Sequence, residues 1–264
     1  MIRTLCLGLG LMLAGQPGLA LTIGVTPGAL ADSVETAATQ ARSQGLDVKV
    51  VEFSDWTTPN VALANGDLDA NYFQHQAFLD NANRETGYGL VSVGVGILPN
   101  IGLYSSKYTS IDQVPQGARV AVASDPVNQG RGLALLQTAG LITLRDGVGA
   151  QGTLDDITGN PRKLNIVEIE GPQLVRALSD VDLAQGYPSH YVNAGLADIA
   201  GRALLFSGAG DAYFAIRFVT RPDRRDDPDL QRFIQIYQTS PAVRDTIADG
   251  YAHNPALYSL PWLK

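Results

Sequence analysis

The segment from Ser124 to Arg131 carries residue types suited to binding an anion. It reads Ser-Asp-Pro-Val-Asn-Gln-Gly-Arg, follows an apolar run at 118–123 that predicts a strand, and begins a stretch with helical spacing. Backbone N–H groups are unpaired at the start of a helix, where the dipole is positive, so this turn favours a negative group. The Arg131 guanidinium could hold a ligand carboxylate, or it could pair with an acidic neighbour; the sequence leaves both open.

Aromatic residues are concentrated between positions 55 and 78, in a chain with only 7% aromatic residues. The rings and one imidazole are those of Trp56, Tyr72, Phe73, His75 and Phe78. Together with interspersed amides they make a suitable wall for a ligand with an apolar or thioether side chain. Some of these rings are expected to be core, Tyr72 first among them. Asp67 and Asp69 are interpreted as capping and solvated residues of a turn rather than an acid–base pair.

Composition excludes several classes of protein. The 264 residues are 45% hydrophobic and 17% charged, which is enough apolar material for a core and more than one small domain needs. A net charge of −7 argues against a general nucleic-acid binder. Cys6 is the only cysteine and the three histidines show no HExxH spacing, so neither a disulfide framework nor a zinc hydrolase is expected.

One glycine-rich motif resembles a cofactor site without its context. Residues 147–152 match G-x-G-x-x-G, but the segment follows a predicted helix instead of a strand, and no suitably placed acidic residue follows. We interpret it as a surface loop, and no cofactor or metal is expected.

The first twenty residues have the features of a cleavable secretory signal peptide. Arg3 provides a positive start, the run from Leu5 to Ala14 is apolar, and Gly18 and Ala20 are small residues before a cut. Gln16 stands where a bacterial lipoprotein would have its lipid-bearing cysteine, so no thioether to a lipid can form. We therefore expect a soluble periplasmic protein without a lipid anchor.

The remainder alternates between short β-rich runs and amphipathic helical stretches. This pattern predicts an α/β fold with mostly parallel sheets flanked by helices. Strands are predicted at 21–25, 48–53, 90–97, 101–105, 118–123, 164–170, 182–185, 203–206 and 214–220, and helices at 29–44, 60–65, 74–84, 128–139, 173–178, 229–239 and 241–251.

Two polar joins, at 110–117 and 207–211, predict a division into two lobes. The first lobe would comprise residues 21–109 and 211–264, and the second would comprise residues 110–210. Ligands of such sheets bind at the carboxyl ends of the strands, which in a two-lobed fold meet in the cleft.

Several motifs resemble the NlpA/MetQ group, the methionine-binding substrate-binding proteins of ABC importers. They are Trp56-x-x-Pro59-Asn60, Gly66 to His75 (GDLDANYFQH), Tyr104-Ser105-x-Lys107, Asp125-Pro126-x-Asn128-x-Gly130-Arg131, the run from Leu136 to Leu144, Asp156-Ile157-x-x-Asn160-Pro161-x-Lys163, and Ala194-Gly195-Leu196. They occur in the family's order from about Leu21 to the C-terminus. The resemblance implies a type II-like periplasmic-binding fold that closes on an amino acid and delivers it to a membrane permease with its ATPase.

The resemblance also implies a set of ligand-binding residues. The aromatic wall for the ligand side chain corresponds to Trp56 (usually tyrosine in the family), Phe73, His75 and Phe78. The arginine that takes the carboxylate corresponds to Arg131, with Asn128 beside it.

Two departures concern the ammonium group of the ligand. The family usually has asparagines at the positions of Tyr187 and Ile216, where their amide oxygens help to hold the ammonium. Ser124 also replaces a frequent asparagine. A buried ammonium without acceptors costs several kcal/mol. We therefore expect a retained aromatic wall and carboxylate clamp with altered recognition at the amine end, where Tyr187 would line the site.

Three functions remain in competition. The first is a solute-binding protein for methionine or a related amino acid or carboxylate, or for a different carboxylate altogether, and not an enzyme. The second is a secreted enzyme acting on small carboxylates, for which Asp69 or Tyr72 would have to approach His75. The third is the ligand-sensing domain of a transcription regulator, against which the signal peptide counts.

Overall fold

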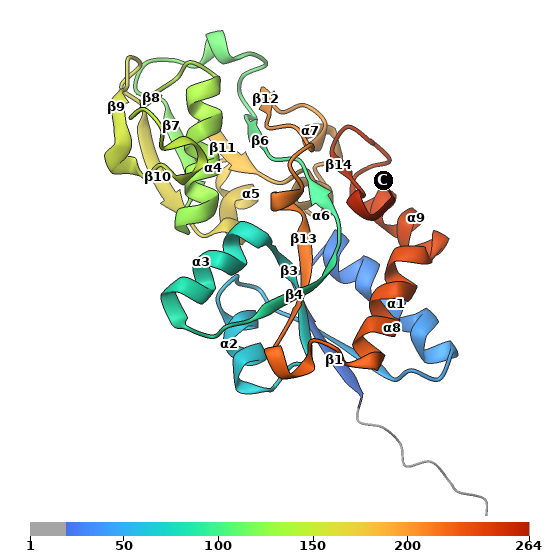
Figure 1. The fold of residues 1–264 in the computed structure, drawn as a ribbon. Coiled ribbons are helices and arrows are strands. Elements are labelled where there is room, and N and C mark those ends of the chain that lie inside the picture. The colour runs from blue at the N-terminus through green and yellow to red at the C-terminus, as the bar shows by residue number, and fades with distance from the viewer. Residues whose placement is uncertain (1–19, 264) are drawn as a thin grey trace, which may run out of the picture.

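Two five-stranded sheets flanked by helices form the two lobes of the computed structural model, which describes residues 20–263 (Figure 1). The blue-to-teal N-terminal part of the chain and its red C-terminal part build one lobe together, and the green-to-yellow middle builds the other (Figure 1). The predicted signal peptide, with Cys6 and Gln16, lies outside the described residues except for its last position. In residues 20–263 no helix has the length and apolar character needed to cross a bilayer.

The first sheet has the strand order β2-β1-β3-β13-β4. Its strands are β1 (Leu21–Val25), β2 (Val48–Glu52), β3 (Ala70–His75), β4 (Val91–Val95) and β13 (Ile216–Thr220). The helices of this lobe are α1 (Ala29–Ser43), α2 (Thr58–Asn65), α3 (Gln76–Thr86), α8 (Pro228–Thr239) and α9 (Pro241–Gly250). β1 pairs in parallel with β2 and β3, whereas β13 is antiparallel to both β3 and β4.

The second sheet repeats this plan in the order β10-β7-β11-β6-β12. Its strands are β6 (Gly102–Tyr104), β7 (Arg119–Ala123), β10 (Asn165–Ile169), β11 (Leu183–Gly186) and β12 (Leu205–Phe206). The helices are α4 (Pro126–Thr138), α5 (Leu174–Ala177), α6 (Pro188–Asn193) and α7 (Ala197–Ala200). Two small ribbons pair β5 (Leu98–Pro99) with β14 (Tyr258–Ser259), and β8 (Thr143–Leu144) with β9 (Ile157–Gly159).

One strand in each sheet departs from the predicted parallel arrangement. β6 is antiparallel to β11 and β12, just as β13 is antiparallel to its neighbours. Each is the strand by which the chain enters that lobe from the other. It starts at the cleft and runs away from it, whereas the strands that lead into the site run toward the cleft.

The predicted boundary between residues 109 and 110 is wrong. β6 already belongs to the second sheet, so the chain leaves the first lobe between β4 and β6. The polar join at 110–117 suggested a crossing, but it is the connection from β6 to β7 within the second lobe and contains one 3-10 turn (Ile111–Gln113). Polarity marks an exposed connection and does not show which two elements it joins.

The sequence analysis did not predict strand β3. It predicted a helix from Gln74 onward, whereas α3 begins at Gln76. All six residues of β3 are buried. A central strand covered on both faces has no alternation of polar and apolar residues, so its period is not visible in the sequence. This strand places Phe73 and His75 at the cleft.

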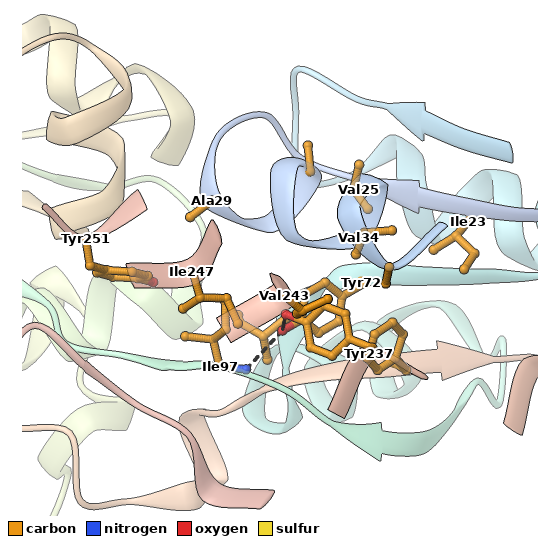
Figure 2. Close-up of a cluster of buried hydrophobic side chains, with 14 of the residues drawn as sticks. Ile23, Val25, Ala29, Val34, Tyr72, Ile97, Tyr237, Val243, Ile247 and Tyr251 are labelled. Atoms are coloured by element: carbon orange, nitrogen blue, oxygen red, sulfur yellow. Dashed lines mark hydrogen bonds between the residues drawn. The ribbon is translucent and has the colours of Figure 1, made fainter. Parts of the chain in front are cut away.

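The core of the first lobe is centred on Tyr72, which is fully buried as predicted. Its hydroxyl accepts the backbone N–H of Ile97 at 2.9 Å and lies 2.9 Å from the hydroxyl of Tyr237 on α8 (Figure 2). The Tyr72 ring stacks on Phe218 of β13 with 4.2 Å between centroids. One side chain thus ties β3 to α8 and to the segment where the chain begins its first crossing.

We expect Tyr72→Phe to lower the free energy of unfolding by about 1–3 kcal/mol, because the buried N–H of Ile97 loses its acceptor. Urea unfolding followed by circular dichroism measures this. Tyr88→Phe, at a ring 36% exposed, is the control and should change stability by less than about 0.5 kcal/mol. Equal stability of the two variants would contradict the role given to the Tyr72 hydroxyl.

Candidate functional site

A cleft of about 540 Å³, counted out to its mouth, lies between the lobes where the carboxyl ends of β1, β3 and β11 meet. Six of the seven predicted ligand-binding residues line it: Trp56, Phe73, His75, Phe78, Asn128 and Tyr187. Ile216 also lines it. The sequence analysis did not single out Thr26, Ser189, His190 and Tyr251, which complete much of the wall.

Trp56 forms the contact between the lobes at one side of the cleft. It follows β2 in the first lobe, in a turn held by Asp55, whose Oδ1 accepts the N–H groups of Thr57 and Thr58 at 2.7 Å. Its ring meets Tyr187 of the second lobe edge-on, with 6.2 Å between centroids. It also packs against Gly171, where a Cβ atom would lie 2.0 Å from the ring. Only glycine leaves room for this closed position.

His75 is the last residue of β3 and caps α3. Its Nδ1 accepts the N–H of Phe78 at 3.1 Å, so the ring proton must be on Nε2, which donates to Asn128 Oδ1 at 3.2 Å. Burial, together with the positive charge of Arg131, lowers the pKa of His75 to about 3. The imidazole is therefore neutral at neutral pH and acts as a fixed donor from the first lobe to the second.

Three buried amides support the floor of the cleft beside His75. Gln74 lines the cleft; its Oε1 accepts from Asn60 Nδ2 at 2.9 Å, and its Nε2 donates to Asn71 Oδ1 at 3.0 Å. Asn71 Nδ2 donates in turn to Asn60 Oδ1 at 2.9 Å. The cluster joins α2 to β3. The amides that the sequence analysis noted between the rings therefore form hydrogen bonds with one another.

The predicted anion-binding turn before α4 already holds an anion of the chain itself. Asp125 caps the helix: its Oδ1 accepts the N–H of Asn128 at 2.9 Å, and both carboxylate oxygens accept from Asn128 Nδ2 at 3.1 Å. Burial raises the pKa of Asp125 despite these donors. The free N–H groups expected for a ligand are therefore partly used by Asp125, which corrects that interpretation. Their effect is to orient Asn128 Oδ1 toward the cleft.

Arg131 is the predicted residue that does not line the cleft. Its side chain is only 6% exposed, and its Nη1 donates to the Tyr187 hydroxyl at 2.8 Å and to Asn128 Oδ1 at 3.5 Å. The ring of Phe214 lies over the guanidinium, 4.2 Å from its carbon. Within residues 20–263 Arg131 forms no ion pair with a carboxylate, so the alternative of an acidic partner is not realised. It stands one side chain behind the wall, and its contact with a ligand stays a prediction.

Among residues 20–263, no side chain that lines the cleft is charged at neutral pH. None of the described residues that line the cleft is Asp, Glu, Lys or Arg. Burial lowers the pKa of His190 to about 4, so this imidazole is neutral as well. The two positions at which the family resemblance implies asparagines present the phenol of Tyr187 and the alkyl chain of Ile216. An ammonium group would meet no carboxylate here.

The residues that an enzyme would need at His75 are elsewhere. The Tyr72 hydroxyl faces Tyr237 and Ile97 in the core. Asp69 accepts the N–H of Thr22 at 2.8 Å and pairs with Arg224, so it joins separate segments and is not the capping, solvated turn residue that was predicted. Neither approaches His75. In the described part of the chain, no three His, Cys, Asp or Glu side chains come together as metal ligands would.

The buried His75 predicts a dependence of stability on pH. An unfolded histidine titrates near 6.5 and His75 near 3, so between these values only the unfolded chain binds the proton. The contribution of neutral His75 to the free energy of unfolding is complete above pH 6.5. It decreases as the pH falls through this window, and about 2 kcal/mol of it is lost by pH 5.

We expect His75→Gln to reduce this loss of stability between pH 7.5 and pH 5, as measured by thermal and urea unfolding at each pH. His253→Gln, at a side chain 74% exposed, is the matched control and should leave the slope as in the parent chain. An unchanged slope in His75→Gln would show that this imidazole is not held neutral.

Comparisons with known proteins agree with this architecture. The sequence model of the family described as NlpA lipoprotein matches residues 21–256. The D-methionine-binding lipoprotein MetQ of Salmonella typhimurium is 41% identical over 220 residues, which cover 83% of this chain and 81% of that protein. A nutrient-binding protein from Burkholderia cenocepacia, solved bound to methionine, is 36% identical with a TM-score of 0.84, over 91% of this chain and 99% of that one.

A periplasmic substrate-binding protein of an ABC transporter from Coxiella burnetii is similar to the same extent. It is 37% identical with a TM-score of 0.82, and the match covers 91% of this chain and 99% of that one. The predicted fold class, a two-lobed periplasmic-binding-protein fold, is therefore confirmed.

Proposed function

Since this chain belongs to the NlpA lipoprotein family, we propose that it is the extracytoplasmic substrate-binding component of an ABC importer. It binds methionine or a related amino acid or carboxylate in the cleft between its lobes and delivers it to the permease. The relatives named above bind methionine or belong to ABC transporters by their own descriptions, which supports this assignment.

The observation that carries the proposal is the way in which the two lobes close on the cleft. His75 from the first lobe donates to Asn128 of the second, and Trp56 packs on Gly171 and Tyr187 across the gap. A ligand that contacts both walls favours this closed state over the open one. The ligand-bound protein therefore has a conformation that a permease can distinguish from the unbound one.

The lining suits a ligand with an apolar or thioether side chain. Phe73 and Phe78 stand edge-to-face with 5.8 Å between centroids, and His75 meets Phe78 with 6.4 Å between centroids. Aromatic rings make favourable contacts with the polarizable sulfur of a thioether. The carboxylate of the ligand would bind Arg131, with Asn128 beside it. Among the described residues no other arginine or lysine lies close to this wall.

A second candidate ligand is a carboxylate without an α-ammonium group. The observation in its favour is the uncharged lining, with Tyr187 and Ile216 in place of amide acceptors. Titration calorimetry with L-methionine, D-methionine, methionine dipeptides and 3-(methylthio)propanoate separates the two. Tight binding of L-methionine refutes the second candidate, and preference for 3-(methylthio)propanoate supports it. A ligand at a hundredfold excess over its Kd should stabilise the fold by about 2.7 kcal/mol.

The partners of the proposed cycle are a membrane permease and its ATPase. Gln16 at the position of the lipid-bearing cysteine supports release in soluble form after export, in contrast to relatives that are named lipoproteins. Recovery in the soluble periplasmic fraction would support this, and a membrane-bound, lipid-modified form would contradict it.

Arg131→Ala is expected to raise the Kd for the carboxylate ligand at least a hundredfold, because it removes the guanidinium that lies directly behind the wall. Calorimetry measures the affinity, and circular dichroism checks that the fold is retained. Arg176→Ala, at an exposed side chain of α5, is the control. Retained affinity in Arg131→Ala would place the carboxylate elsewhere.

Gly171→Ala is expected to weaken binding about tenfold, since its Cβ would lie 2.0 Å from the Trp56 ring and push the lobes apart. Small-angle scattering with saturating ligand should show less compaction than in the parent chain. Gly210→Ala, where a Cβ would meet no atom within 4 Å, should behave like the parent chain. Normal affinity and compaction in Gly171→Ala would remove this contact from the closing mechanism.

A further inference from the structure

We propose that the Tyr187 hydroxyl is a displaceable cap on Arg131, occupying the donor that a ligand carboxylate would use. This inference rests on the proposed function, because it concerns how a ligand of that site gains access to its cation.

The first observation is that the hydroxyl is fully engaged. It accepts from Arg131 Nη1 at 2.8 Å and donates to Asn128 Oδ1 at 2.9 Å. A phenol has one proton to donate, so this hydroxyl has no proton left for a ligand. Asn128 is equally committed, because its Oδ1 also accepts from His75 and its Nδ2 donates to Asp125.

The second observation is the order of the groups along the wall. Tyr187 and Asn128 line the cleft, and Arg131 lies behind them, with only 6% of its surface exposed. Phe214 covers one face of the guanidinium. A carboxylate that enters the cleft therefore reaches Arg131 through the place of the Tyr187 hydroxyl.

Displacement is favourable because of the difference in hydrogen-bond strength. A guanidinium–carboxylate pair joins two charges, and it is stronger than the guanidinium–phenol bond that it replaces. Tyr187 stands at the start of α6, with its ring edge-on to Trp56 and 5.4 Å from His190. When the cap moves, these rings, which close the cleft, must adjust, so exposure of Arg131 and closure are coupled. The cap lowers the affinity for a carboxylate by the free energy needed to break its two hydrogen bonds.

The test compares Tyr187→Phe with the parent chain in titrations with L-methionine, 3-(methylthio)propanoate and L-methioninamide. Removal of the hydroxyl should tighten binding of the two carboxylates about tenfold. L-Methioninamide has no carboxylate, and its affinity should not increase. Tyr108→Phe also loses a hydrogen-bonded hydroxyl of the second lobe, one that donates to Asp182 away from the cleft, and it should leave all affinities unchanged.

Weaker or equal binding of the carboxylates by Tyr187→Phe would overturn the proposal, because the hydroxyl would then help or ignore the ligand. A second readout needs no ligand. Phenylglyoxal, with modified arginines mapped by mass spectrometry, should modify Arg131 several-fold faster in Tyr187→Phe, while the exposed Arg145 reacts equally in both proteins. If none of the three compounds binds any variant, the proposed function fails, and the rate at Arg131 alone decides whether the cap exists.

Discussion

A buried guanidinium that forms no ion pair with a carboxylate of residues 20–263 is the constraint around which the cleft is built. Arg131 needs acceptors to remain buried, and in this structure it finds them in Tyr187 and in Asn128 Oδ1. That oxygen also accepts from His75 of the other lobe. One of the two acceptors of the arginine is therefore also the atom that accepts a hydrogen bond from the other lobe. In the proposed cycle a ligand carboxylate would compete for the hydrogen bond from Arg131 to Tyr187.

The two lobes bring to this junction side chains that are rigid for different reasons. On the first lobe, β3 is anchored by the Tyr72 hydroxyl below and by the amide cluster around Gln74 beside it, so His75 has one position and one tautomer. On the second lobe, Asp125 holds Asn128 by three hydrogen bonds. In the proposed cycle, Tyr187 and Trp56 are the side chains that move when the wall opens. Among residues 20–263 the lining is uncharged, so in the proposed function Arg131 would provide the electrostatic selection.

Much of the fold followed from patterns that a short segment contains. Strands such as β1 and β7, with apolar runs, and helices such as α1, with small apolar residues every three to four positions, were predicted within a few residues. β3 was missed because burial on both faces removes its period, and α6 was missed because six residues after a proline show too little repeat. The aromatic wall was found from residue types together with a family resemblance. His190, Ser189 and Tyr251 carry no such signal, and they reach the cleft only through the packing of α6 and α9.

The sequence by itself determined the class of fold, the family, and six of the side chains that line the cleft, because residue type, spacing and motif order are local properties. Tertiary structure alone decided which lobe β6 joins, which groups Asp125 binds, and that Arg131 lies behind Tyr187 and Asn128. Those outcomes depend on distances between residues as far apart in the chain as Leu103 and Leu205, which pair β6 with β12. Such distances are set by the packing of elements within the second lobe, and no local pattern of residue types reports them.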